Sequence, residues 1–212
     1  MKMSILKLIW FFAIFTLIIN CNIKAQKTQS DILIDNQNYR NNMNKEFADT
    51  AESPLTKEGI TKFKKIRFYP IKTKFRVVAK LVLTPNEQAF EMPRSKGNTG
   101  TYRKYGEATF VLNGKEFTLS VYQYMKLIND EQYKNDLFLP FKDLTNGKQT
   151  YGGGRFLELQ KPTGEALVID FNKAYNPLCC YHNPKYSCPI PPLENHLQVK
   201  INAGEKRYKY PK

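Results

Sequence analysis

The sequence predicts an α+β protein that is mainly antiparallel β, folded as a sandwich or partial barrel, with an N-terminal helix packed outside. Segments in which apolar and polar residues alternate recur at short intervals, and turn signals separate them. Strands do not alternate with helices, as they would in a parallel α/β fold. The chain has 212 residues, of which 42% are hydrophobic and 13% aromatic, so we expect one domain with a real core behind a removable leader.

The first residues predict export. Lys2 and Lys7 form a basic start, residues 8–19 are apolar except for Thr16, and Ala25 offers a small residue at a cleavage point. This pattern is typical of a secretory signal peptide, here residues 1–25. A membrane-spanning helix needs roughly 18 to 20 apolar residues, more than this run supplies. The expected location is therefore the periplasm or cell envelope.

Cys21 leaves a lipoprotein alternative open, because such proteins are cut and acylated at a Cys just after the apolar run. Asn20 is bulky and polar where a small residue is usual, which favours cleavage after Ala25. That cleavage removes three lysines and no acid, so the formal charge falls from +14 to +11. It also removes Trp10, the only Trp of the chain. A membrane is an expected partner only if Cys21 is lipidated.

Residues 26–53 form the predicted N-terminal helical segment, and residues 54–212 the β-rich domain. Ser30 and Asp31 are suited to cap a helix with apolar positions at Ile32, Tyr39, Met43 and Phe47. The helix should end before Pro54. Thr56 is then expected to cap a short helix that carries Ile60 and Phe63.

Strands follow from the alternating pattern. Residues 75–83 place one apolar row on one face of a strand. Asn113-Gly114 between residues 108–112 and 117–122 predicts a hairpin with a type I′ turn, since both central residues need positive φ. A final strand is expected over residues 196–201.

A second hairpin is predicted to pair residues 155–161 with residues 166–171 through a turn at Thr163-Gly164. In that register Arg155 faces Asn172, and Arg155 is expected to neutralise Asp170 across the hairpin. One end of this surface is then apolar and the other polar.

Two polar segments are candidate sites of chemistry. Residues 141–155 are rich in glycine and turn formers, but the glycines precede Arg155 and a strand, unlike a phosphate-binding loop. We therefore expect no cofactor. The long loop after Asp170 cannot be held by strand hydrogen bonds throughout. In an oxidising compartment, a disulfide between its cysteines can hold it instead. Cys188 can pair with either Cys179 or Cys180, stabilising the fold by about 2–3 kcal/mol.

Two alternatives remain for this region. A metal site could use Cys180, His182 and Cys188, although the paired spacing usual for zinc is missing. A small envelope hydrolase could use Asp170, Glu194 or His182, although no nucleophile signature supports catalysis. Whether the protein is an enzyme is left open.

Eight basic residues and no acid lie between Lys62 and Lys80, interleaved with aromatic residues. In a cytosolic protein this pattern would indicate nucleic acid. Export argues against a nucleic acid partner and leaves acidic glycans, anionic lipid head groups or a solvated strand face.

Several long motifs carry a family resemblance. They are SPLT at 53–56, FLPFKD at 138–143, TYGGGR at 150–155, DFN at 170–172, AYNP at 174–177, Cys179, CP at 188–189, PP at 191–192, EN at 194–195 and AGE at 203–205. Over essentially the whole mature chain, the sequence resembles the bacterial and archaeal DUF1684 family, a domain of unknown function. The resemblance implies no activity or catalytic residue. Because the family's usual residue after the first Cys resembles Ala, it makes Cys179 the expected partner of Cys188 and Cys180 the odd thiol.

The leading hypothesis is a binding or structural domain of the envelope that takes a small or anionic ligand and acts as a monomer. Its candidate site is the polar end of the second hairpin with the Cys loop, the loop after Asp170 that carries Cys179, Cys180 and Cys188. The site residues are Tyr151, Arg155, Asp170, Asn172, Tyr175 and Glu194. Arg155 offers a planar donor fork for a carboxylate or phosphate, held in place by Asp170.

Overall fold

The computed structural model describes residues 28–209. The predicted signal peptide, Cys21 and Trp10 lie outside the described residues. Within them no helix is both long and apolar enough to cross a membrane. The second of two compact units begins at Asn36.

The two predicted helices are present. Helix α2 spans Gln29–Ala48 and so ends before Pro54, as expected. Helix α3 spans Lys57–Lys62, and the Thr56 hydroxyl accepts a hydrogen bond from the Gly59 N–H at 3.0 Å, which confirms the predicted cap.

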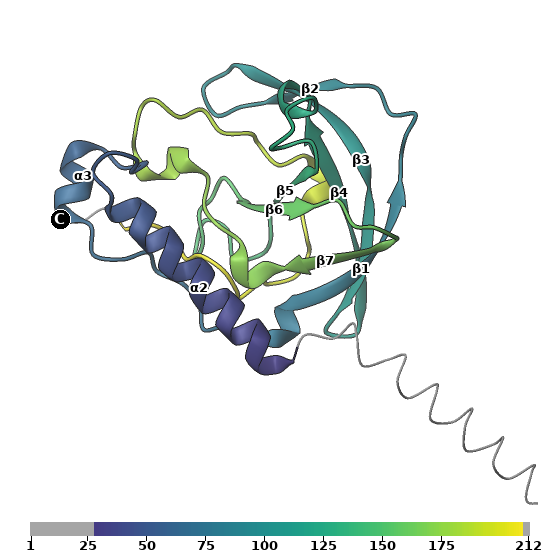
Figure 1. The fold of residues 1–212 in the computed structure, drawn as a ribbon, viewed down its shortest axis with the longest axis horizontal. Coiled ribbons are helices and arrows are strands. Elements are labelled where there is room, and N and C mark those ends of the chain that lie inside the picture. Colours follow the sequence, from purple (N-terminus) through teal and green to yellow (C-terminus); the bar gives the residue numbers. More distant parts are fainter. Residues whose placement is uncertain (1–27, 210–212) are drawn as a thin grey trace, which may run out of the picture. The chain divides into compact units, whose positions relative to one another are not determined.

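The main body is one curled, half-barrel sheet of antiparallel strands (Figure 1), so the predicted α+β class is confirmed. Among the described residues its order is β6-β5-β4-β3-β1-β7, with β2 paired to β3. The strands are β1 (Arg76–Leu83), β2 (Phe90–Pro93), β3 (Thr99–Leu112), β4 (Lys115–Tyr124), β5 (Asp136–Phe141), β6 (Arg155–Gln160) and β7 (Ala166–Asp170). Short 3-10 turns include Phe171–Lys173, Leu178–Tyr181 and Leu193–Asn195.

The Asn113-Gly114 hairpin is confirmed. Its two turn residues have φ of 52° and 76°, and Phe110 pairs with Phe117 across β3 and β4. Positive φ at both positions gives the turn the twist that flanking strands need.

The second predicted hairpin is wrong. β6 pairs with β5 and β7 pairs with β1, so the two strands lie at opposite edges of the sheet. A tight primed turn needs positive φ, which neither Thr163 nor Gly164 adopts. The alternation of apolar and polar residues correctly predicted both strands, but it does not indicate which strands pair with each other in the sheet.

The predicted last strand, residues 196–201, is also wrong. The segment lies against the sheet without joining it: Leu197 and Ile201 pack into the main core with side chains from the sheet strands. Its polar backbone groups find other partners, since the Leu197 N–H donates to Lys142 O at 2.8 Å and Arg155 donates to Ile201 O at 2.9 Å.

Asn195 joins the sheet where β4 and β5 diverge. These strands have a single paired position, Tyr122 with Phe138. The buried Asn195 amide donates to the carbonyls of Ser120 and Pro140 at 2.8 and 2.7 Å, and its carbonyl accepts from Ser120 N–H. The side chain thus replaces ladder hydrogen bonds that the two strands do not make with each other.

Candidate functional site

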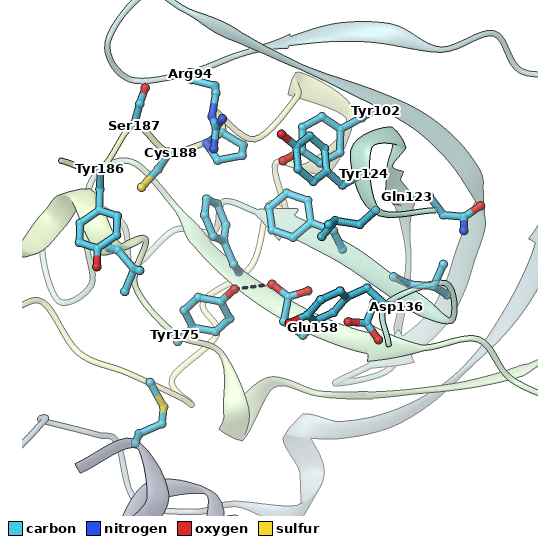
Figure 2. Close-up of a pocket in the computed structure, with 18 of the residues that line it drawn as sticks. Arg94, Tyr102, Gln123, Tyr124, Asp136, Glu158, Tyr175, Tyr186, Ser187 and Cys188 are labelled. Carbon is cyan, nitrogen blue, oxygen red and sulfur yellow. Dashed lines mark hydrogen bonds between the residues drawn. The ribbon is translucent and has the colours of Figure 1, made fainter. Parts of the chain in front are cut away.

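A cavity of about 600 Å³ opens between the sheet, the later part of α2 and the Cys loop (Figure 2). Nine aromatic side chains line it, together with a few polar groups. They are Tyr39, Phe47, Tyr102, Tyr124, Tyr133, Phe138, Phe156, Tyr175 and Tyr186. Both the volume and the mostly apolar lining with a few placed polar groups are typical of a small-molecule site.

Five of these rings form one continuous wall. Tyr102 and Tyr124 are cross-strand partners on β3 and β4 and stack with centroids 4.9 Å apart. Phe138 lies 5.6 Å from Tyr102 and makes an edge contact with Phe156 at 4.9 Å, and Phe156 contacts Tyr175 at 5.9 Å. Because the rings hold one another, the wall is preformed for a flat or apolar ligand.

Glu158 and Tyr175 form the polar group at one side of the cavity. The Tyr175 hydroxyl donates to Glu158 Oε1 at 2.5 Å, as Figure 2 shows. Protein surrounds the Glu158 carboxyl on most sides, yet the side chain stays accessible because it faces the cavity. Burial raises its pKa above the ordinary value, whereas the Tyr175 hydrogen bond acts in the opposite direction.

Arg94 supplies the cation of the cavity. Its backbone is fixed by a bridge to Pro189 and by the hydrogen bond from its N–H to Asn98 O at 2.9 Å. In Figure 2 its guanidinium points toward the rings from the side opposite Glu158 and Asp136. The Arg94 Nε is buried, and no described residue accepts a hydrogen bond from it. A buried N–H without a partner is costly, so this donor favours a ligand with an acceptor group.

Arg155 occupies a different place from the one predicted. Its side chain is 0% exposed, and it donates to Asp143 Oδ2 at 2.5 Å, to Ile201 O and to Ala203 O. The predicted pairing with Asp170 is therefore wrong, because β6 and β7 are not neighbours. The Arg155 guanidinium therefore binds the C-terminal segment through the carbonyls of Ile201 and Ala203.

Asp170 and Asn172 lie together, but away from Arg155. Asp170 accepts hydrogen bonds from the Asn36 side chain at 2.9 Å and from the Asn172 backbone at 3.0 Å, and it pairs with Arg76 at 3.4 Å. The Asn172 side chain accepts a hydrogen bond from Lys72 N–H and donates one to Lys72 O, each at 2.9 Å. These side chains pin α2 and the start of β1 to the end of β7.

The other predicted site residues are dispersed. Tyr175 lines the aromatic cavity, and Tyr151 lines a smaller cleft that also contains Cys179 and His182. Glu194 is exposed and accepts a hydrogen bond from the Tyr122 hydroxyl at 2.7 Å. The structure thus places only Tyr175, of the six residues, in the large cavity.

The cysteines of the loop lie close together. The Cys179 backbone N–H donates to Cys188 Sγ at 3.1 Å, and the two side chains also hydrogen bond. This contact lowers the pKa of the Cys179 thiol and raises that of Cys188. Cys180 is buried beside Tyr181, and burial raises its pKa. No metal-binding group of three His, Cys, Asp or Glu side chains occurs within residues 28–209.

Sequence reasoning missed most of the cavity. Glu158 offered a signal, since it is the only charged residue in the apolar run of β6 from Phe156 to Leu159. Arg94 offered none, because a single arginine after a short strand is common on protein surfaces.

Comparisons with known proteins place this fold in a family. The family described as "Protein of unknown function (DUF1684)" matches residues 61–206. The chain is similar to an uncharacterized protein of Haloarcula marismortui solved by NMR in solution, with 30% sequence identity and a TM-score of 0.65. That match covers 84% of this chain and 95% of the other. No curated protein matches the chain.

Proposed function

The chain belongs to the DUF1684 family, whose description assigns no function, and we propose that it is a binding protein of the cell envelope. Its ligand is a small, mostly apolar or ring-containing molecule with an anionic or acceptor group. The aromatic cavity holds the body of the ligand, and Arg94 binds the acceptor group. The observation that carries the proposal is the Arg94 guanidinium in the lining of an aromatic cavity of about 600 Å³, with no described residue accepting a hydrogen bond from its buried Nε.

The charges of the lining support an anionic group at Arg94 rather than elsewhere. Asp136 already accepts a hydrogen bond from Gln160 at 2.6 Å, and Glu158 accepts one from Tyr175. Burial favours the protonated form of Glu158. Arg94 is therefore the group in the cavity with unused capacity for a carboxylate or sulfonate, and a planar guanidinium suits both.

The test uses anilinonaphthalene sulfonate, a fluorescent probe that combines aromatic rings with one sulfonate. We expect the chain to bind it, and Arg94→Gln to weaken binding by roughly tenfold, since a hydrogen bond between charged groups is lost. Lys80→Gln is the control for the loss of one positive charge, because Lys80 is exposed on β1 and outside the cavity. Equal affinity of Arg94→Gln and the wild type would refute the proposal.

A second experiment identifies the natural ligand. Protein purified natively from the envelope is denatured, and the released small molecules are analysed by mass spectrometry. An acidic, largely apolar compound recovered from the wild type but not from Arg94→Gln is the expected result.

We also propose that the mature domain is exported and that Cys179 and Cys188 form a disulfide there. The sequence of residues 1–25 supports export, and the hydrogen bond from the Cys179 backbone N–H to Cys188 Sγ at 3.1 Å supports the pairing. Both thiols are oxidised by exchange with an oxidised dithiol carrier, whose disulfide takes up the two electrons and two protons. A non-reducing peptide map that links Cys180 to Cys188 would contradict the pairing, and a retained Met1 would contradict export.

The hydrolase alternative receives no support from the placement of its residues. Asp170 is held by Asn36 and Arg76, Glu194 by Tyr122, and His182 lies in the small cleft beside Cys179. An activity screen on ester, phosphate and glycoside substrates, with Ala variants of the three, tests it directly.

A further inference from the structure

Two adjoining clefts, distinct from the aromatic cavity, concentrate basic residues. Their volumes are about 520 and 600 Å³, and they share Arg67, Lys206, Tyr208 and Lys209. The first is also lined by Lys62, Lys64 and Lys65, and the second by Lys148, His182 and Arg207. We call this pair of clefts the basic cleft.

Tertiary structure assembles the basic cleft from distant segments. Lys206 N–H donates to Arg67 O at 2.7 Å, and Tyr69 N–H donates to Gly204 O at 2.9 Å. Arg207 N–H donates to Gln149 O at 2.9 Å, which adds the loop that carries Lys148. These backbone bonds hold three cationic segments side by side in fixed register.

Only part of the basic stretch in the sequence contributes. Lys62 to Arg67 line the cleft, whereas Arg76 pairs with Asp170, and Lys80 is exposed on β1. A merely solvated strand face would leave the cations spread along β1. Instead they converge with the C-terminal segment on one concave surface.

Most cations of the basic cleft form no ion pair with a described carboxylate, whereas Lys62 at its edge pairs with Glu58 at 2.9 Å. Elsewhere, Lys104 and Lys134 pair with nearby glutamates at 2.5 and 2.6 Å. Within residues 28–209, by contrast, Lys64, Lys65, Arg67, Lys206 and Lys209 form no ion pair. Like charges held together in a concave surface raise the local positive potential and attract anions.

The acid in the lining, Glu205, forms no ion pair with them within residues 28–209. Glu205 is 1% exposed, and its carboxyl accepts hydrogen bonds from the Tyr181 hydroxyl and from Asn176 N–H at 2.6 Å. Its oxygens are therefore engaged below the surface of the cleft.

Aromatic rings give the cleft a shaped floor. Lys206 Nζ lies over the Tyr69 ring, 4.8 Å from its centroid, and Tyr181 and Tyr208 make an edge contact at 4.8 Å. The first contact keeps the Lys206 ammonium in position. A concave site with several fixed cations suits a compact polyanion better than a planar membrane, which would touch only the cleft rim.

We propose that the basic cleft binds a molecule carrying several phosphate groups in a row or cluster. One phosphate would neutralise one or two of the cations, whereas a ligand spanning both clefts engages the shared Arg67 and Lys206 together with cations on each side. Lysine ammonium and arginine guanidinium groups are the side chains that proteins use for phosphate.

The test is titration calorimetry of the chain purified from the envelope, with inorganic tripolyphosphate as the probe. The double variant Arg67→Gln, Lys206→Gln removes two positive charges from the lining that both clefts share. The matched control, Lys80→Gln with Lys115→Gln, removes two charges from exposed strand positions. We expect the first to weaken binding roughly tenfold or more and the second to change it little.

Two outcomes would overturn the proposal. If both double variants weaken tripolyphosphate binding equally, the affinity reflects net charge and not the cleft. If the wild type binds vesicles of phosphatidylglycerol but not tripolyphosphate, the surface serves a membrane instead. Unchanged binding of anilinonaphthalene sulfonate by the Arg67 and Lys206 variant is expected, and it also establishes that this variant is folded.

Discussion

Glu205 is expected to make the stability of this protein depend on pH near neutrality. Burial raises its pKa to about 7, against which the hydrogen bonds from Tyr181 and Asn176 and the nearby Arg155 act only in part. In the unfolded chain the ordinary value is 4.5. The folded state therefore binds the proton more tightly than the unfolded state between these two values.

The sign and size of the effect follow from linkage. Where the folded state binds more protons, stability falls as pH rises, so the loss begins near pH 4.5 and is complete above about pH 7. A pKa difference of about 2.5 corresponds to roughly 3 kcal/mol of unfolding free energy. The side chain is fully buried, so solvent screening reduces this little.

The perturbation is Glu205→Gln, which keeps the shape and removes the titration. The Gln carbonyl can accept from Asn176 N–H, and its amide can donate to the Tyr181 hydroxyl oxygen. Urea unfolding followed by circular dichroism at several pH values gives the free energy for both proteins. Relative to the wild type, the variant should gain about 3 kcal/mol between pH 4.5 and pH 8.

Other titrating groups do not obscure the result. Glu158 also has a raised pKa, but it is present in both proteins and cancels in the difference. A difference between variant and wild type that stays constant over this pH range would refute the assignment of the raised pKa to Glu205.

Four further substitutions test the framework around the sites. Asp143→Ala should destabilise the fold by about 3–5 kcal/mol in urea unfolding, because it leaves the fully buried Arg155 without its counter-charge; a loss below 1 kcal/mol would count against this. Gly106→Ala should cost about 1–3 kcal/mol, since the new Cβ would meet a backbone oxygen at 2.5 Å, and an unchanged melting temperature would contradict it. Cys188→Ser should remove about 2–3 kcal/mol from the oxidised protein, whereas Cys180→Ser should leave its sensitivity to reductant intact.

The parts of the fold that the sequence could predict are those set by neighbours along the chain. Thr56 caps α3 because its hydroxyl reaches an N–H three residues ahead, and Asn113-Gly114 makes its turn because those residues tolerate positive φ. Alternation over residues 75–83 likewise predicted β1. Each of these depends on interactions within a few residues.

Tertiary structure decided which strand lies beside which and therefore where the sites are. β6 and β7 are consecutive strands, yet they lie at opposite edges of the sheet. Arg155 on β6 therefore lies far from Asp170 on β7 and pairs with Asp143 instead. The aromatic cavity and the basic cleft each combine segments far apart in sequence, such as Arg67 with Lys206. The sequence alone determined the local elements and their apolar faces, because short-range sterics and hydrogen bonds fix them. Which distant strands pair was decided only by how their apolar faces pack in the folded protein, since any strand with the same alternation of apolar and polar residues could serve as a partner.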